Sequence, residues 1–350
     1  MSFWSRRKVC ELLRRFAFAA LLLSSFGAQA KPVKLPAYNV DIAQSSVSGL
    51  SSGAAMATQF DVAHSSIMKG AGIVAGPPYY CAQFNTFTAI SVCSCLSRSC
   101  QPVSIDVPSL TRYTTDRAKA GVIDDPSHLG AQKIFILSGT LDRTVMPDVM
   151  KAVRSYYLHF ANDPANVSWN TVTGDHAMPT ESYGKPCTYY GSPYIDDCNY
   201  DAAGKLIAWI YGPDINAKAT GKLTGSLMQF DQGEFTAGAP ILSSMDNTGW
   251  VYVPLACQQG EPCVAHVAFH GCEQGYSYVK KAFITHAGYN EWADTNHIIV
   301  LYPQAVPTAA NPLGCWNWWG YDFDPGYATR GATQIKAVRA MLDRLASGHR

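Results

Sequence analysis

The pentapeptide Gly-Leu-Ser-Ser-Gly at residues 49–53 constrains the fold of this chain most, because it spells G-x-S-x-G between a strand-like and a helix-like segment. Residues 38–47 have the pattern of a strand, and the alanine-rich residues 52–63 that of a helix. A sharp strand-to-helix turn lifts the serine hydroxyl clear of the sheet, and a helix N-terminus beneath it stabilises negative charge. The motif therefore predicts a nucleophile elbow with Ser51 at its tip.

The rest of the chain alternates between strand-like and helix-like segments. Strands are predicted at 68–76, 133–138, 167–172, 227–235, 250–254, 265–269 and 297–302, and further helices at 147–160 and 333–345. The run KIFILS at 133–138 is apolar throughout, as is typical of a parallel strand buried on both faces. Residues 79–108 contain four cysteines and little periodicity, which indicates a cross-linked excursion. This alternation predicts one α/β domain of three layers over residues 31–350.

The first thirty residues have the features of a secretory signal peptide. Five basic residues precede an apolar stretch at 16–26, and Ala28-Gln29-Ala30 is a small-residue cleavage site. We expect the mature chain to begin near Lys31 and to be secreted or periplasmic. No later stretch has the pattern of a membrane span, so no stable membrane insertion is expected. The net charge of +1 gives no reason to expect nucleic acid as a partner.

Cysteine usage agrees with export. Ten of the 11 cysteines follow the signal peptide, and an even number in an exported chain indicates a disulfide framework. Short loops predict the pairs Cys187–Cys198 and Cys257–Cys263, leaving Cys272 and Cys315 as a long-range pair. The remaining cluster is Cys81, Cys93, Cys95 and Cys100, whose internal pairing stays open. Cys93-Ser-Cys95 lacks the spacing of a zinc knuckle, so no metal site is expected.

Ser51 needs a base and a carboxylate to act as a nucleophile, and suitable residues follow two later strands. Asp142 comes after the strand at 133–138 and His176 after the strand at 167–172, in the order Ser, Asp, His found in α/β-hydrolases. Asp148 and Asp175 are the competing acids. Asp175 is poorly placed because adjacent residues point different ways. We therefore predict a Ser51, Asp142, His176 triad.

The loop that would complete an oxyanion hole normally lies upstream of the nucleophile, but the mature chain has too few residues there for several strands. His270-Gly-Cys272 follows the strand at 265–269 instead. The predicted fold is therefore an α/β-hydrolase with circularly permuted strands, which is feasible where chain termini lie close together. The backbone N–H groups of Ser52 and Cys272 would form the hole. His270 is expected to orient this loop and not to act as the base.

Five ordered motifs carry a resemblance to a known family. They are Ser48-Gly-Leu-Ser-Ser-Gly53, Ser138-Gly-Thr-Leu-Asp142, Gly174-Asp-His176, His270-Gly-Cys272 and Gly314-Cys-Trp-Asn-Trp-Trp319. The chain resembles secreted poly(3-hydroxybutyrate) depolymerases with a circularly permuted single-domain catalytic fold. The resemblance implies a serine esterase acting on short-chain polyesters, with Cys272 tied by a disulfide beside the oxyanion loop. Many relatives also have a linker and a polymer-binding domain, which this sequence lacks, so weak action on crystalline granules is expected.

The substrate site is expected to be an apolar crevice, because the polymer is an aliphatic chain of esters. Trp316 follows a cysteine tethered to the oxyanion loop, so it is predicted to form an aromatic wall for the substrate, while Trp318 is expected to pack in the core. We expect a monomer that binds a polyester or oligoester and needs no cofactor. A feruloyl or acetylxylan esterase, or a catalytically silent secreted binding protein, are the alternatives.

Overall fold

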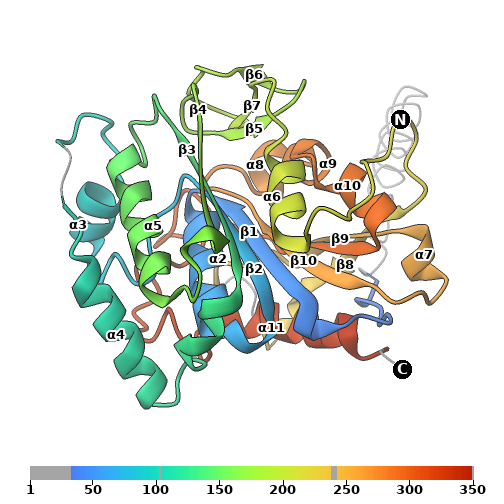
Figure 1. The fold of residues 1–350 in the computed structure, drawn as a ribbon, viewed down its shortest axis with the longest axis horizontal. Coiled ribbons are helices and arrows are strands. Elements are labelled where there is room, and N and C mark those ends of the chain that lie inside the picture. Colours follow the sequence, from blue (N-terminus) through green and yellow to red (C-terminus); the bar gives the residue numbers. More distant parts are fainter. Residues whose placement is uncertain (1–32, 102–103, 238–242, 349–350) are drawn as a thin grey trace, which may run out of the picture. The chain divides into compact units, whose positions relative to one another are not determined.

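The computed structural model describes residues 33–101, 104–237 and 243–348, and its centre is a sheet of eight strands (Figure 1). In spatial order the strands are β4 (Val167–Val172), β3 (Lys133–Gly139), β2 (Met68–Val74), β1 (Ser45–Leu50), β10 (Val264–Phe269), β11 (Ile298–Tyr302), β9 (Thr248–Val253) and β8 (Ser226–Asp231). Among the described strands of this sheet, β9 runs opposite to the other seven, so its pairings with β11 and β8 are antiparallel and the remaining pairings are parallel. A small second sheet has the order β5 (Met178–Thr180), β7 (Ile195–Asp197) and β6 (Lys185–Pro186).

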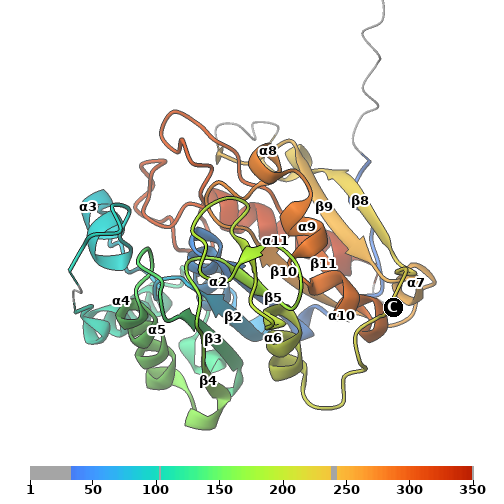
Figure 2. The same cartoon turned by 90° about the horizontal axis from the view of Figure 1, so that it is seen from above.

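Helices cover both faces of the large sheet, which gives the predicted three layers (Figure 2). On one face, α2 (Ser52–Ala63) contacts α11 (Thr333–Ala346), and the Tyr157 hydroxyl of α5 (Pro147–Phe160) donates to Asp61 of α2. On the other face, α6 (Ala202–Tyr211) contacts α10 (Tyr289–Asn296). Shorter or peripheral helices are α3 (Thr86–Thr88), α4 (Val107–Lys119), α7 (Leu255–Gln258), α8 (Tyr276–Val279) and α9 (Ala282–His286). Every residue of α2 is buried, so its alanines allow close packing on the sheet.

Most predicted elements are confirmed, and two boundaries are wrong for the same reason. Helices α2 and α5 and strand β4 begin and end where predicted. The strand before the elbow begins at Ser45, not at residue 38, because the Asp41 side chain caps a 3-10 turn over Ile42–Gln44. Likewise β8 ends at Asp231, whose side chain caps a second 3-10 turn over Gln232–Phe235. At both places the aspartate side chain accepts a backbone N–H group and so stabilises a turn where the sequence pattern predicted a strand.

The two halves of the chain occupy opposite halves of the sheet. Strands β1 to β4 lie in sequence order on one side, and β8 to β11 form the other side, joined where β1 pairs in parallel with β10. The backbone N–H of Tyr38 donates to Leu345 O at 2.7 Å, so the beginning and the end of the described chain lie together. The strands that normally precede the nucleophile thus follow it, and the predicted circularly permuted α/β-hydrolase arrangement is confirmed.

The predicted signal peptide, residues 1–30, lies outside the described residues. From Val33 onward the described chain forms one compact unit. Among the described helices, none has the length and apolar character needed to cross a membrane.

Candidate active site

Ser51 occupies a strained turn between β1 and α2. Its φ of 58° and ψ of −121° lie in a region that side chains with a Cβ rarely adopt. A Cβ on Gly49 would lie 2.3 Å from Gly53 C, and one on Gly53 would lie 2.3 Å from Phe269 O. Glycine at these two positions therefore allows the turn to close and the strand β10 to pass beside it, which is the geometry of a nucleophile elbow.

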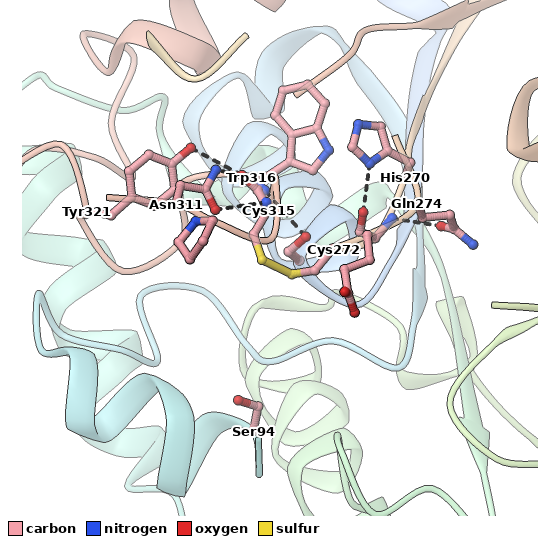
Figure 3. The surroundings of a disulfide bond; sticks show 12 residues. Ser94, His270, Cys272, Gln274, Asn311, Cys315, Trp316 and Tyr321 are labelled. Carbon is pink, nitrogen blue, oxygen red and sulfur yellow. Dashed lines mark hydrogen bonds between the residues drawn. A yellow bond between two sulfur atoms is a disulfide. The ribbon is translucent and has the colours of Figure 1, made fainter. Parts of the chain in front are cut away.

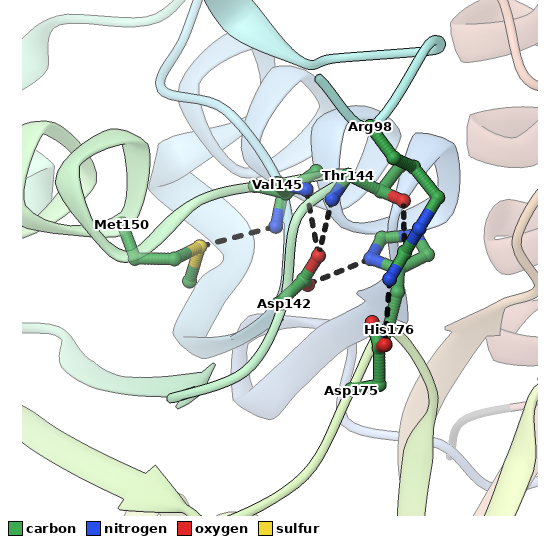
Figure 4. A network of polar contacts seen from close by, with 8 residues as sticks. Arg98, Asp142, Thr144, Val145, Met150, Asp175 and His176 are labelled. Carbon is green, nitrogen blue, oxygen red and sulfur yellow. Dashed lines mark hydrogen bonds and ion pairs between the residues drawn. The ribbon is translucent and has the colours of Figure 1, made fainter. Parts of the chain in front are cut away.

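Asp142 and His176 lie on the loops after β3 and β4 and contact each other directly. The His176 Nδ1 atom is 2.7 Å from Asp142 Oδ2, and both side chains are almost completely buried. Asp142 Oδ1 accepts the backbone N–H groups of Thr144 at 2.7 Å and Val145 at 2.9 Å (Figure 4). With the proton on Nδ1 directed at Asp142, Nε2 of His176 is left as an acceptor.

The two competing acids have other partners. Asp148 is exposed at the first turn of α5 and pairs with Lys151 at 2.7 Å. Asp175 Oδ1 accepts the backbone N–H of His176, and its Oδ2 lies 2.6 Å from Arg98 Nη2. Neither carboxylate contacts the His176 ring in the described structure, so Asp142 is the acid that this geometry pairs with it.

Arg98 connects both of these loops. Besides its ion pair with Asp175, it donates from Nη1 to Thr144 Oγ1 at 3.0 Å (Figure 4). Its guanidinium also lies 3.7 Å from the centre of the Tyr190 ring. Arg98 belongs to the loop closed by Cys95–Cys100, and Cys95 N–H donates to Thr144 O at 2.6 Å. This loop thus fixes the neighbours of Asp142 and His176.

A pocket of about 220 Å³ opens beside Ser51 and His176. Its apolar and aromatic lining consists of Leu50, Ile90, Leu96, Val145, Tyr190, Tyr194, Pro312, Leu313, Trp318 and Trp319. Among the described residues that line it, none is Lys or Arg. Such a pocket suits an uncharged, aliphatic ligand.

The predicted role of Trp316 is wrong. Trp316 is fully buried and absent from the described pocket lining, because its ring packs between Phe269 and His270, with centroid distances of 5.0 and 5.5 Å. Trp318 and Trp319 line the pocket instead. Trp318 was expected to pack in the core. It packs in the small apolar cluster around Ala55 and Cys93, and it also lines the pocket.

The loop 270–274 lies against the elbow and is held from several sides (Figure 3). His270 bonds Gly271 O through Nδ1 at 2.7 Å and accepts the Ala305 N–H at Nε2, while burial lowers the pKa of His270 to about 4. Both ring nitrogens are therefore engaged, and His270 is a neutral orienting residue, as expected. Gln274 Oε1 accepts the Gly271 N–H at 2.7 Å.

The N–H groups of Ser52 and Cys272 are the candidates for an oxyanion hole. Both residues line the pocket, and neither N–H donates to another residue within the described parts of the chain. A Cβ built on Gly271 would lie 3.5 Å from Ser51 Cβ, so this loop passes directly beside the serine. The Cys272–Cys315 disulfide ties it to the segment that carries the tryptophans (Figure 3).

All ten cysteines after the signal peptide are paired. The disulfides are Cys81–Cys93, Cys95–Cys100, Cys187–Cys198, Cys257–Cys263 and Cys272–Cys315. Three of these pairs are those predicted, and the structure divides the open cluster into two short-range pairs.

Three pocket or loop residues were not singled out from the sequence: Arg98, Glu273 and Trp319 as a wall residue. Glu273 directly follows the motif His270-Gly-Cys272, and Trp319 ends the last motif, so the sequence motifs already indicated the part of the site in which both residues lie. Arg98 had no such signal, because its partners Thr144 and Asp175 are distant in sequence.

A serine at an elbow, an Asp–His pair and two available N–H groups beside an apolar pocket define the class as a serine hydrolase with the α/β-hydrolase fold. Comparison with known proteins then shows that the chain belongs to the poly(3-hydroxybutyrate) depolymerase family. It is 42% identical over 336 residues to the poly(3-hydroxybutyrate) depolymerase of Delftia acidovorans, covering 95% of this chain and 65% of that protein. It is 38% identical to the polyhydroxybutyrate depolymerase of Talaromyces funiculosus over 94% of this chain and 97% of that protein.

Solved structures agree with these sequence relatives. The PHB depolymerase from Penicillium funiculosum superimposes with a TM-score of 0.82 at 38% identity, covering 91% of this chain and all of that one. A serine-to-alanine variant of a PHB depolymerase complexed with an R3HB trimer has a TM-score of 0.83, with the same identity and coverage. No protein-family model matches the chain.

Proposed function

We propose that this protein is a serine esterase that hydrolyses poly(3-hydroxybutyrate) or its oligomers through an acyl-enzyme. Ser51 is the nucleophile, His176 the general base and Asp142 the carboxylate that orients and stabilises the imidazolium. The backbone N–H groups of Ser52 and Cys272 stabilise the oxyanion. The 2.7 Å contact between Asp142 and His176, on loops that meet beside the Ser51 elbow, is the observation that carries this proposal.

The reaction needs two acyl-transfer steps. His176 Nε2 takes the Ser51 proton as Oγ attacks the ester carbonyl carbon, and the tetrahedral oxyanion is stabilised by the two N–H groups. The C–O bond to the leaving alcohol then breaks, and His176 gives that alcohol its proton. Water, deprotonated by His176, attacks the acyl-enzyme in the same way, which releases the hydroxy acid and restores the Ser51 hydroxyl.

The chemistry of the pocket supports an aliphatic polyester as substrate. The lining is mostly apolar and provides no cation among its described residues to bind a charged polymer. The sequence relatives are depolymerases by name, and one solved relative holds an R3HB trimer. Residues 31–350 would act as one catalytic domain and as a monomer, because one chain supplies every residue invoked.

Export to the periplasm or the medium, with cleavage near Ala30, is part of the proposal. It is supported by the five disulfides of the described chain, since such bonds persist in oxidising compartments.

The direct test uses the exported, purified protein on several esters in parallel. Turbidity of an amorphous poly(3-hydroxybutyrate) suspension should clear, soluble oligomers should be cleaved, and short p-nitrophenyl esters should be preferred over long ones. Methyl ferulate and acetylated xylan should react far more slowly. If the protein released ferulate or acetate and left the oligomers intact, it would be a carbohydrate esterase and not a polyester hydrolase. Failure of Ser51 to react with a fluorophosphonate would indicate a silent binding protein.

A further inference from the structure

Glu273 stands out in the candidate active site because it is the one carboxylate in the described pocket lining. The other ionisable lining residues are His176 and two tyrosines. Glu273 follows Cys272 directly in the chain, and both residues line the pocket. No Lys, Arg or His forms an ion pair with it in the described residues.

The Glu273 carboxylate is held in place by its surroundings. Tyr194 donates its hydroxyl to Glu273 Oε2 at 3.0 Å, and the backbone N–H of Glu273 donates to Leu313 O at 2.8 Å. Both partners line the pocket. Tyr194 is fixed in turn, because Gln274 Nε2 donates to its carbonyl oxygen at 2.9 Å. Burial together with the Glu273 charge raises the pKa of Tyr194, so this hydroxyl remains a donor.

We propose that Glu273 is a specificity-determining residue that discriminates against carboxylates in the pocket. This inference rests on the proposed function and concerns the same site. The interior of a polyester chain is uncharged, so an ester bond there places no charge near Glu273. A short oligomer with a free carboxyl terminus carries a negative charge on its leaving-group side, close to the bond that is cleaved.

Repulsion between two carboxylates has two consequences here. Short free-acid oligomers bind and react less well than uncharged ones of the same length, so the enzyme favours long chains and leaves short acids as products. The hydroxy acid formed by deacylation is also expelled, because its new carboxylate arises beside Ser51. A nearby like charge in a partly solvated pocket changes such preferences by roughly three- to tenfold.

The test compares one 3-hydroxybutyrate trimer as the free acid and as its methyl ester. The wild type should have a kcat/KM about three- to tenfold higher for the methyl ester, and high salt should reduce this ratio. Glu273→Gln should bring the ratio close to one, because the free acid improves relative to the methyl ester while a glutamine oxygen still accepts the Tyr194 hydroxyl. Inhibition by 3-hydroxybutyrate should become stronger in the variant.

Two controls separate this inference from other causes. Glu261→Gln removes an equal charge from an exposed position and should leave the ratio at its wild-type value. p-Nitrophenyl butyrate, which is uncharged, reports any general effect of Glu273→Gln on activity, and the ratio of the two trimers, taken within each variant, is independent of that effect. An unchanged ratio in Glu273→Gln, with the methyl ester still cleaved, would overturn the role of Glu273. Absence of cleavage of both trimers would overturn the proposed function instead.

Discussion

Arg98 Nη2 lies 2.6 Å from Asp175 Oδ2, so the Cys95–Cys100 loop is bound to the residue that precedes His176. The same guanidinium reaches Thr144, whose N–H donates to Asp142. One arginine thus bridges the neighbours of the proposed base and the proposed acid. Arg98 touches neither member of the pair and acts as a positioning residue.

Arg98→Ala should lower kcat for p-nitrophenyl butyrate by about tenfold or more, because small displacements of reacting groups are costly. KM should change less than kcat, since Arg98 is absent from the described pocket lining and contacts it through Thr144 and the ring of Tyr190. Arg98→Lys should recover only part of the rate, because an ammonium cannot span both partners as a guanidinium does. Arg154→Ala, an exposed site on α5, is the control. A rise in KM at constant kcat would contradict the positioning role.

The Cys272–Cys315 disulfide should affect rate as well as stability. Removing both cysteines by substitution with alanine should lower kcat by up to about 10²-fold, because an oxyanion donor on the loop is no longer held. The free energy of unfolding should fall by about 2–5 kcal/mol. The Cys257→Ala, Cys263→Ala double variant loses a disulfide outside the pocket lining and should keep the wild-type kcat.

Mass spectrometry of the non-reduced protein gives an independent check of the cross-links. It should find no free thiol in the mature chain and a linked peptide pair containing Cys272 and Cys315. Equal losses of kcat in the two double variants would remove the special role of the loop.

Substitution of Trp319 should mainly lower activity, whereas substitution of Trp316 should mainly lower stability. Trp319→Ala removes part of the pocket wall, so kcat/KM for a 3-hydroxybutyrate trimer should fall about tenfold, while p-nitrophenyl acetate, which fills less of the pocket, is little affected. Trp316→Ala empties a fully buried site and should cost about 3–5 kcal/mol in the free energy of unfolding. If Trp316→Ala lowered kcat/KM for the trimer and Trp319→Ala lowered only the free energy of unfolding, Trp316 and not Trp319 would form the pocket wall.

Asp61 makes stability depend on pH. It is fully buried in α2, one of its oxygens has no partner among the described residues, and burial raises its pKa from 3.8 to about 7. A raised pKa means that the folded state holds a proton which the unfolded state has lost. The free energy of unfolding is therefore not reduced by this carboxyl below pH 3.8, and it decreases as pH rises from 3.8 to about 7.

Asp61→Asn should therefore gain stability relative to the wild type as pH rises through this window, by up to about 1.4 kcal/mol per pH unit. Urea unfolding at a series of pH values measures this difference. For Asp148→Asn, at an exposed site on α5, the difference in the free energy of unfolding from the wild type should be nearly the same at every pH. A difference for Asp61→Asn that is independent of pH would show that folding does not raise the pKa of Asp61.

The sequence predicted the permuted sheet and the residues of the proposed triad because each depends on local signals. Ser51, Asp142 and His176 follow strands, and parallel strands bring their carboxyl ends to one edge of a sheet. The place of His270-Gly-Cys272 after a strand indicated the permutation. Burial of a side chain in an irregular segment has no such periodic signal, so Trp316 was assigned the wrong surroundings and Trp319 was assigned no role. The contacts of Arg98 depend on how loops distant in sequence pack together, which no local pattern indicates.

The most direct measurement of the central claim is capture of the acyl-enzyme. The protein is mixed with a 3-hydroxybutyrate trimer methyl ester, quenched rapidly in acid and digested for mass spectrometry. An acyl group of one or two 3-hydroxybutyrate units should be found on Ser51. His176→Ala, Asp142→Ala and Ser51→Ala should each lower turnover by several orders of magnitude, whereas Asp148→Ala keeps it. Turnover of the trimer by Ser51→Ala at the wild-type rate, or an acyl group on another residue, would contradict the account.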